Sequence, residues 1–318
     1  MEPPDISKLQ DLRTSSTFSS VAHQFVENLK VLEVRINAVP ENMEICCCFK
    51  ESERGRRLGY YSLQTVLSWP SNSVRISDII LASGPIEQES VTWMEISRLP
   101  ELLQIVESRL DANEASLEVS SMRTDTLRRQ AVWDLAHVLY DRYMEKDIFS
   151  YVSLPFSGEM SFQFLRRRLR TSRTRKIHPR GIWPSKANRY LREFIFQPYF
   201  LGLNTEMFAS SNRCQSFKTT AKKALKFLRH WSQQDPNPKL YLVVSSTKLP
   251  KNLPEEVIVT QRNGSGNKQC PVYAIEHPVY KKNWLLGTYL SAIHTLIVRW
   301  VKCTCPEKEC DCNVYNLV

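Results

Sequence analysis

The stretch Val31-Leu-Glu-Val-Arg-Ile36 alternates apolar and charged side chains with a period of two, as a β-strand with one buried face does. Three further stretches alternate in the same way or run apolar, and Pro40, Gly55 and Pro70 supply turn residues between them. These stretches are residues 43–49, 58–67 and 74–81. The pattern predicts a meander of four antiparallel strands, with residues 91–96 as a candidate fifth strand.

Helical spacing flanks this predicted sheet in the sequence. Apolar residues recur every three or four positions up to Leu32, again after Pro100, and a third time between Thr126 and Met144. Pro100 suits the first turn of a helix, where the N–H that proline lacks would have no partner. Residues 18–149 are therefore predicted to form one acidic α+β domain, an antiparallel sheet flanked by helices, preceded by a flexible arm over residues 1–17.

The second half of the chain is predicted to be a separate, basic α+β domain of mixed helices and short strands, over residues 150–301. Pro155 and Gly158 mark the boundary. Prolines and a glycine interrupt residues 171–184, which are predicted to be a mobile loop. Helical spacing is found over residues 186–196, 216–231 and 283–301, and β-prone runs are found over residues 240–245, 256–260 and 272–275.

Nearly all of the excess positive charge lies in one segment, residues 161–230. This segment holds 17 Lys and Arg residues against two acidic residues, whereas residues 1–160 hold 16 against 24. The whole chain has a formal net charge of +10, so the excess is local. A local excess of this size predicts a polyanionic partner.

Arginine suits phosphate binding, because its planar guanidinium stays charged and offers five donors, and a cluster of such groups releases counterions from a polyanion. The residues predicted to hold phosphate are Arg166, Arg167, Arg168, Arg170, Arg173, Arg175, Lys176 and Arg180. Aromatic residues are interleaved with them, and Trp183 is the predicted stacking residue for an unpaired base. The apolar run from Phe194 to Phe200 is too dense to face water and is predicted to be core.

Three other interpretations of the Arg run stay open. It has the composition of a nuclear localisation signal, of a docking site for an acidic protein, and of an internal partner for the acidic first domain. A transport signal is compatible with nucleic-acid binding. The protein is therefore predicted to be intracellular and nuclear.

Residues 302–318 form a Cys-rich tail with two C-x-C pairs separated by four residues. Four thiolates suit tetrahedral zinc, so the predicted metal ligands are Cys303, Cys305, Cys310 and Cys312. The usual structural zinc site has wider pairs and a longer loop, and free thiols are the alternative. Cys46-Cys-Cys48 lies in a predicted strand, where alternate side chains face opposite sides, and is predicted to be buried and structural.

No complete catalytic or cofactor motif occurs. The sequence lacks H-E-x-x-H, G-x-S-x-G, a P-loop and the dinucleotide-binding fingerprint, and it has only nine Gly. It also lacks an apolar run long enough for a membrane helix and a basic leader followed by an apolar stretch. Apart from zinc at the tail, the sequence therefore predicts no cofactor, no enzymatic activity and no transmembrane segment.

These observations predict a non-enzymatic, nucleic-acid-associated adaptor. It would hold the phosphate backbone of RNA or DNA through the Arg-rich segment and bind protein subunits of a larger complex through the N-terminal domain. The alternative is a structural or assembly subunit, such as a complex scaffold or a viral matrix-like protein, whose basic face docks on an acidic protein or an anionic membrane. An enzyme would need a nucleophile, a base and an orienting carboxylate, and no such trio can be placed from the sequence.

Overall fold

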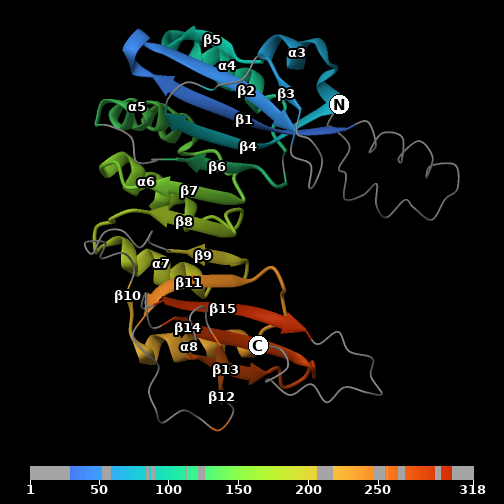
Figure 1. Ribbon diagram of the computed structural model, residues 1–318, viewed down its shortest axis with the longest axis vertical. Helices are drawn as coiled ribbons and strands as arrows, with labels where there is room; N and C mark the ends of the chain where they lie inside the picture. The colour runs from blue at the N-terminus through green and yellow to red at the C-terminus, as the bar shows by residue number, and fades with distance from the viewer. Residues whose placement is uncertain are drawn as a thin grey trace, which may run out of the picture. The chain divides into compact units, whose positions relative to one another are not determined.

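The structure is a computed structural model in which the chain divides into two compact units (Figure 1). Unit 1 comprises residues 1–143 with 148–151, and unit 2 comprises residues 144–147 with 152–318. The described residues are 29–51, 59–83, 86, 90–111, 113–120, 126–205, 218–246, 255, 257–263, 269–290 and 295–302. Among them, no helix combines the length and the apolar character needed to cross a membrane.

Unit 1 is built on a mixed sheet with the strand order β6-β4-β1-β2-β3. Its strands are β1 (Lys30–Val39), β2 (Glu44–Glu51), β3 (Tyr60–Tyr61), β4 (Val74–Ser83), β5 (Thr92–Glu95) and β6 (Ser116–Val119). β1 and β2 form an antiparallel hairpin, and β3 and β5 also pair antiparallel to β2. β1, β4 and β6 are parallel. The predicted mixture of helices and strands is confirmed, but the prediction of a purely antiparallel N-terminal sheet was wrong.

The sheet is mixed because a helix lies in the connection between β3 and β4. Within the predicted strand over residues 58–67, the two residues of β3 are followed by α3 (Leu63–Ser68). Ser62 begins this helix, because its side-chain oxygen accepts a hydrogen bond from the backbone N–H of Thr65 at 3.2 Å. A crossover of this kind returns the chain to pair in parallel, whereas a tight hairpin would have reversed it.

Helices α4 (Leu99–Glu107) and α5 (Thr126–Tyr143) supply the rest of the unit 1 core. α5 packs against β1 and β4, and it buries Leu135 and Leu139. A bidentate ion pair joins the two helices, with Arg142 Nε and Nη2 at 2.7 and 3.0 Å from the carboxylate oxygens of Glu107. The predicted arm over residues 1–17 lies outside the described residues, as does most of the first predicted helix.

Unit 2 is built on a longer mixed sheet with the strand order β7-β8-β9-β11-β15-β14-β13-β12. β8, β9 and β11 are parallel, and β11, β15, β14, β13 and β12 pair antiparallel in that order. The short β10 (Lys218–Thr219) pairs with β11. The strands are β7 (Tyr151–Pro155), β8 (Lys176–Arg180), β9 (Gly202–Asn204), β11 (Tyr241–Ser246), β12 (Ile258–Asn263), β13 (Gln269–Glu276), β14 (Asn283–Leu290) and β15 (Thr295–Lys302).

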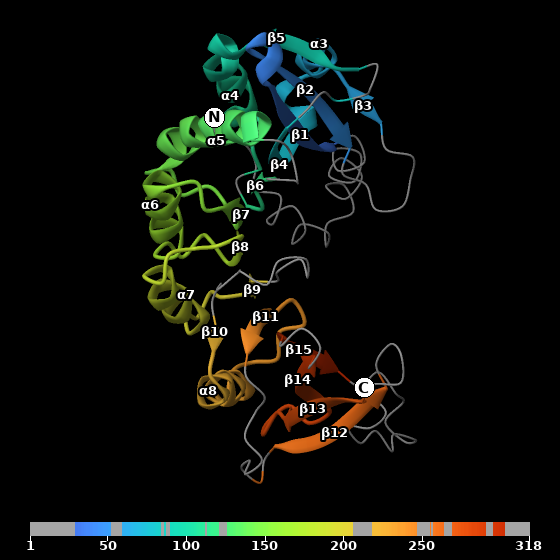
Figure 2. The ribbon, with the colours of Figure 1, turned by 60° about the vertical axis from the view of Figure 1, so that its left-hand side comes forward.

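Three helices line one side of these strands, as Figure 2 shows. They are α6 (Glu159–Arg168), α7 (Ala187–Ile195) and α8 (Ala221–Ser232). Aromatic rings fill much of this layer: Phe200 stacks on Trp231 of α8 with ring centroids 5.3 Å apart, and Phe194 meets Phe200 edge to face. This bears out the prediction that Phe194 and Phe200 belong to a core, whereas Phe196 and Tyr199 are only half-buried.

The prediction of a final helix over residues 283–301 was wrong, because this stretch forms β14 and β15. Both faces of β14 are covered. On one face Gly287 lies against Leu228 of α8, and on the other Trp284 and Leu286 join a buried cluster with Val272 and Ala274 of β13. A strand buried on both faces reads as a continuous apolar run, which periodicity cannot tell from a buried helix.

Candidate nucleic-acid interface

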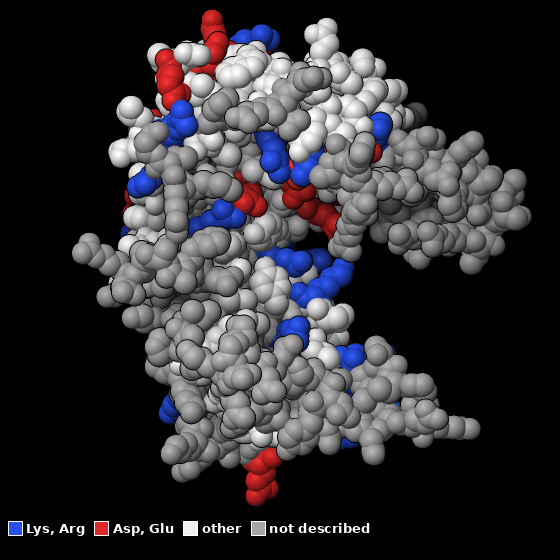
Figure 3. Space-filling model, viewed as in Figure 1, with Lys and Arg blue, Asp and Glu red and all other residues white. Residues whose placement is uncertain are grey.

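The structure distributes the predicted phosphate-binding residues over three consecutive parts of unit 2. Arg166, Arg167 and Arg168 form the last turn of α6. Arg170, Arg173 and Arg175 follow in the connection, and Lys176 and Arg180 are the ends of β8. Figure 3 shows Lys and Arg side chains gathered at the height at which Figure 1 places β8, β9 and β11. β8 itself corrects the prediction of a loop throughout residues 171–184.

Arg168 is not available to a ligand, so its assignment as a phosphate-binding residue is withdrawn. Its side chain has no solvent exposure. Nη1 donates to the backbone carbonyl of Lys146 at 2.6 Å, Nη2 donates to that of Met144 at 2.7 Å, and Asp147 Oδ1 lies 3.5 Å from Nη1. The guanidinium also lies over the ring of Phe164. Arg168 therefore anchors the segment 144–147 on unit 2.

Trp183 is also buried and does not present a ring face to solvent, which corrects the prediction that it stacks on an unpaired base. It is 5% exposed, and its indole N–H donates to the backbone carbonyl of Arg180 at 3.0 Å. Its ring packs against Phe156 with centroids 5.4 Å apart. An indole held in this way cannot receive a base without leaving its own packing.

Two arginines of the predicted set share one aromatic ring. The guanidinium carbons of Arg166 and Arg170 lie 5.4 and 5.5 Å from the ring centroid of Tyr190 on α7. Cation–π contact orients a guanidinium without neutralising its charge. Both guanidinium groups are therefore oriented by the ring while they keep their positive charge.

The basic residues differ in whether a carboxylate already neutralises them. Arg167 pairs with Glu145 at 2.9 Å. In the parts of the chain that the structure describes, no ion pair is found for Arg170, Arg173, Arg175 or Lys176. These four residues, which we call the basic path, therefore hold a concentrated positive charge that no carboxylate among the described residues offsets.

β8 alternates between the two faces of the sheet. Ile177 and Pro179 are buried, whereas Lys176, His178 and Arg180 are half-buried and lie on the opposite face. Burial, with a smaller contribution from the Arg180 charge, lowers the pKa of His178 to about 4. His178 is therefore neutral near pH 7 and adds hydrogen-bonding capacity to this face without adding charge.

The lowered pKa of His178 predicts a loss of stability in acid. An unfolded chain takes up a proton on this histidine near pH 6.5, whereas the folded chain resists protonation down to about pH 4. Stability should therefore fall as the pH drops through this window, by about 2–3 kcal/mol in total. The measurement is urea unfolding of the wild type and of His178→Gln at a series of pH values. The variant should lose less stability in acid than the wild type, and the difference is the contribution of His178. The matched variant His137→Gln in unit 1 should lose as much stability in acid as the wild type does. If His178→Gln also loses as much as the wild type, the expectation is wrong.

Strand pairing places a row of residues across the same face of unit 2. Lys176 of β8 is paired with Gly202 of β9, Gly202 with Tyr241 of β11, and Tyr241 with Arg299 of β15. Paired residues of neighbouring strands project to the same face, so Lys176, Tyr241 and Arg299 share one face. The strands β7, β8, β9, β11 and β15 contain no Asp or Glu at all.

Tyr241 and Arg299 were not among the predicted site residues. Their local signal is weak, because a single Tyr or Arg in a β-prone stretch reads as an ordinary strand residue. The five segments lack carboxylates in the sequence, but the sequence did not show that they are strands lying side by side: β8 was predicted to be a loop and β15 part of a helix.

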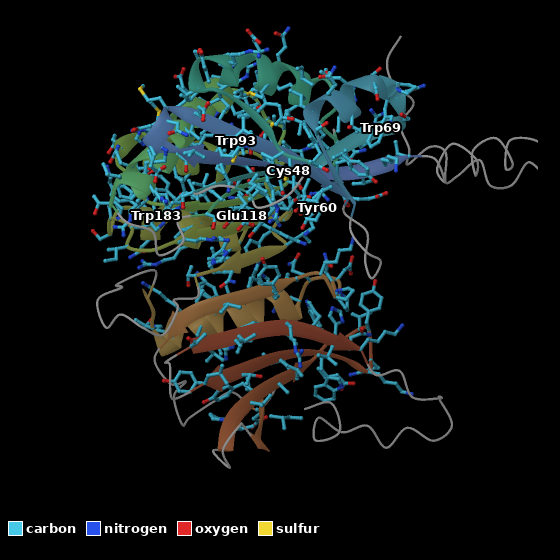
Figure 4. All side chains as sticks on the ribbon, turned by 45° about the horizontal axis from the view of Figure 1, so that its top comes forward. Cys48, Tyr60, Trp69, Trp93, Glu118 and Trp183 are labelled. Atoms are coloured by element: carbon cyan, nitrogen blue, oxygen red, sulfur yellow. The ribbon has the colours of Figure 1, made fainter. Side chains whose placement is uncertain are left out.

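The predicted zinc ligands Cys303, Cys305, Cys310 and Cys312 lie outside the described residues. Within the described residues, no group of three or more His, Cys, Asp or Glu is arranged to hold a metal ion. Cys46, Cys47 and Cys48 are fully buried on β2, where Figure 4 marks Cys48, and the prediction that they are buried is confirmed. Burial raises the pKa of the Cys47 thiol to about 12 and that of Cys48 to about 11, so both are protonated near neutral pH.

In comparisons with known proteins, no family model, no curated protein and no solved structure matches the chain.

Proposed function

We propose that this protein is a non-enzymatic, nucleic-acid-associated adaptor that holds phosphate backbone on unit 2. The contacts come from the basic path, Arg170, Arg173, Arg175 and Lys176, with Arg166 and Arg180 on either side of it. The other two predicted arginines have different tasks: Arg168 is buried, and Arg167 is paired with Glu145.

The observation that supports this proposal best is that no carboxylate among the described residues pairs with the basic path. Like charges held close together repel one another, so a dense basic surface is favourable only where an anionic partner is bound or where local structure gains from it. The last turn of α6 has such a local reason, because cations there offset the negative end of the helix dipole by about 0.3–1 kcal/mol each. The basic path lies beyond that turn, and the helix dipole does not account for it.

Unit 1 supports the adaptor part of the proposal through exposed apolar side chains. Met43, Trp93 and Ile96 are exposed by 74%, 47% and 37%, and the backbone N–H of Ile96 donates to the carbonyl of Met43. Figure 4 marks Trp93. Large apolar side chains grouped in this way are typical of protein-binding surfaces, where aromatic residues and Met are enriched.

Binding across a salt series tests the phosphate contacts. Six contacts should give a slope of log affinity against log salt of about −4 for a single strand and about −5 for a duplex. The measurement is fluorescence anisotropy of the full-length protein with labelled single- and double-stranded RNA and DNA. A protein that binds none of these at low salt would overturn the proposal, and flotation with anionic vesicles would then support the structural-subunit alternative.

A further inference from the structure

We propose that the nucleic acid bound by unit 2 is single-stranded and that one of its bases stacks on Tyr241. This inference rests on the proposed function and goes beyond it, because it names the strand form and a second contact type. It replaces Trp183, which is buried, with a residue on the sheet face that the helices leave uncovered.

The position of the Tyr241 ring comes from its neighbour Gly202. A Cβ atom built on Gly202 would lie 2.4 Å from Cε1 of Tyr241 and 2.7 Å from its Cζ. Real Cβ atoms do not approach a ring carbon so closely, so the ring occupies the space that a side chain at position 202 would fill. The ring therefore lies over Gly202 of β9, and Tyr241 is half-buried.

The residues on either side of this ring suit a phosphate backbone. Lys176 lies beyond Gly202 on β8, and Arg299 is paired with Tyr241 on β15 and is exposed. Neighbouring strands are about 4.8 Å apart, so the two cations lie about 10 Å and 5 Å from Tyr241 along the row. No carboxylate occurs on any of the strands that carry them.

The row has a limited length. Beyond β15 it continues into Leu286 of β14 and Ala274 of β13, which are buried in the apolar cluster of that end of the sheet. At the other end, Lys176 joins the basic path that leads back to α6. The face therefore accommodates a few nucleotides, with the basic path continuing the phosphate contacts away from the ring.

An aromatic ring between cations on the sheet face opposite the helices favours single strands for a physical reason. Bases in a duplex stack on one another, so their faces are not free to meet a protein ring, whereas the bases of a single strand can be splayed out. Stacking of this kind tolerates any base, because every base has a π-face. We therefore expect binding with little sequence preference.

The test compares Tyr241→Ala, Tyr241→Leu and Tyr241→Phe in the full-length protein, using a labelled single-stranded oligonucleotide and a duplex of the same length. We expect Tyr241→Ala and Tyr241→Leu to weaken single-strand binding by about 5- to 150-fold, and Tyr241→Phe, which keeps the ring, to change it by about twofold or less. The salt slope should stay unchanged in all three variants, because no phosphate contact is removed. Duplex binding should not depend on the ring.

The leucine variant keeps an apolar side chain of similar bulk, and thermal unfolding of each variant checks the fold. Unchanged single-strand affinity in a folded Tyr241→Leu protein overturns this inference while the proposed function stands, provided the wild-type salt slope is steep. Equal losses for single strand and duplex also overturn it. A wild-type protein that binds neither form at low salt overturns both.

Discussion

Replacing Arg168 with methionine is expected to lower the free energy of unfolding by about 1.5–3 kcal/mol, the cost of losing hydrogen bonds that a charged group donates. The side chain has no solvent exposure, and its two terminal nitrogens are bonded to the backbone carbonyls of Met144 and Lys146. Methionine fills similar space without donating, so both carbonyls lose a donor in a partly buried setting. Urea unfolding of the full-length protein, with the slope checked for a change in two-state behaviour, measures the loss.

Arg167→Met is the matched control for this substitution. Its side chain is 48% exposed and pairs with Glu145, which is 77% exposed. An exposed pair of this kind contributes at most about 1 kcal/mol, so the control should be close to wild type in stability. Equal losses in the two variants would mean that the buried hydrogen bonds of Arg168 are not what stabilises this part of unit 2.

Neutralising the basic path, by changing Arg170, Arg173, Arg175 and Lys176 together to glutamine, is expected to weaken single-strand binding about 100-fold or more near physiological salt. Each phosphate contact releases about 0.7 of a counterion from a single strand, so four lost contacts should flatten the salt slope by about 3. Anisotropy titrations of wild type and variant over the same salt series give both quantities. The loss should be similar for every oligonucleotide sequence, because phosphates carry no sequence information.

A second region of unit 2 provides a control with the same change in charge. Helix α8 carries Lys222, Lys223, Lys226 and Arg229, and changing these four residues to glutamine removes the same formal charge from the same unit. If only net charge mattered, both variants would lose affinity equally, and the assignment of the phosphate contacts to the basic path would be wrong. We expect the α8 variant to retain most of the affinity.

Much of the fold was predictable where the local pattern and the packing agree. The hairpin of β1 and β2 follows from alternation, and α4 and α5 follow from helical spacing. The prediction failed where both faces of an element are covered, as in β14, and where a short helix, α3, changes the direction of the next strand. In both places the decisive contact lies far away in the sequence.

The candidate site shows the same division. Its location on residues 161–230 and its partner class were predicted from charge alone, because net charge depends only on composition. The roles of single residues were not predictable. Arg167 and Arg168 are neighbours in the chain, yet one is exposed and the other is buried, because successive residues of a helix point in directions about 100° apart.

The sequence by itself therefore determined that unit 2 carries a concentrated positive charge and that the chain mixes helices with strands, since both properties come from composition and local periodicity. Only the tertiary structure decided which basic side chains are exposed and which residues lie beside them. Strand pairing brings Tyr241 and Arg299 onto one face with Lys176, although they are far apart in the sequence. Register between distant strands arises from packing of the whole sheet, which no local stretch of sequence specifies.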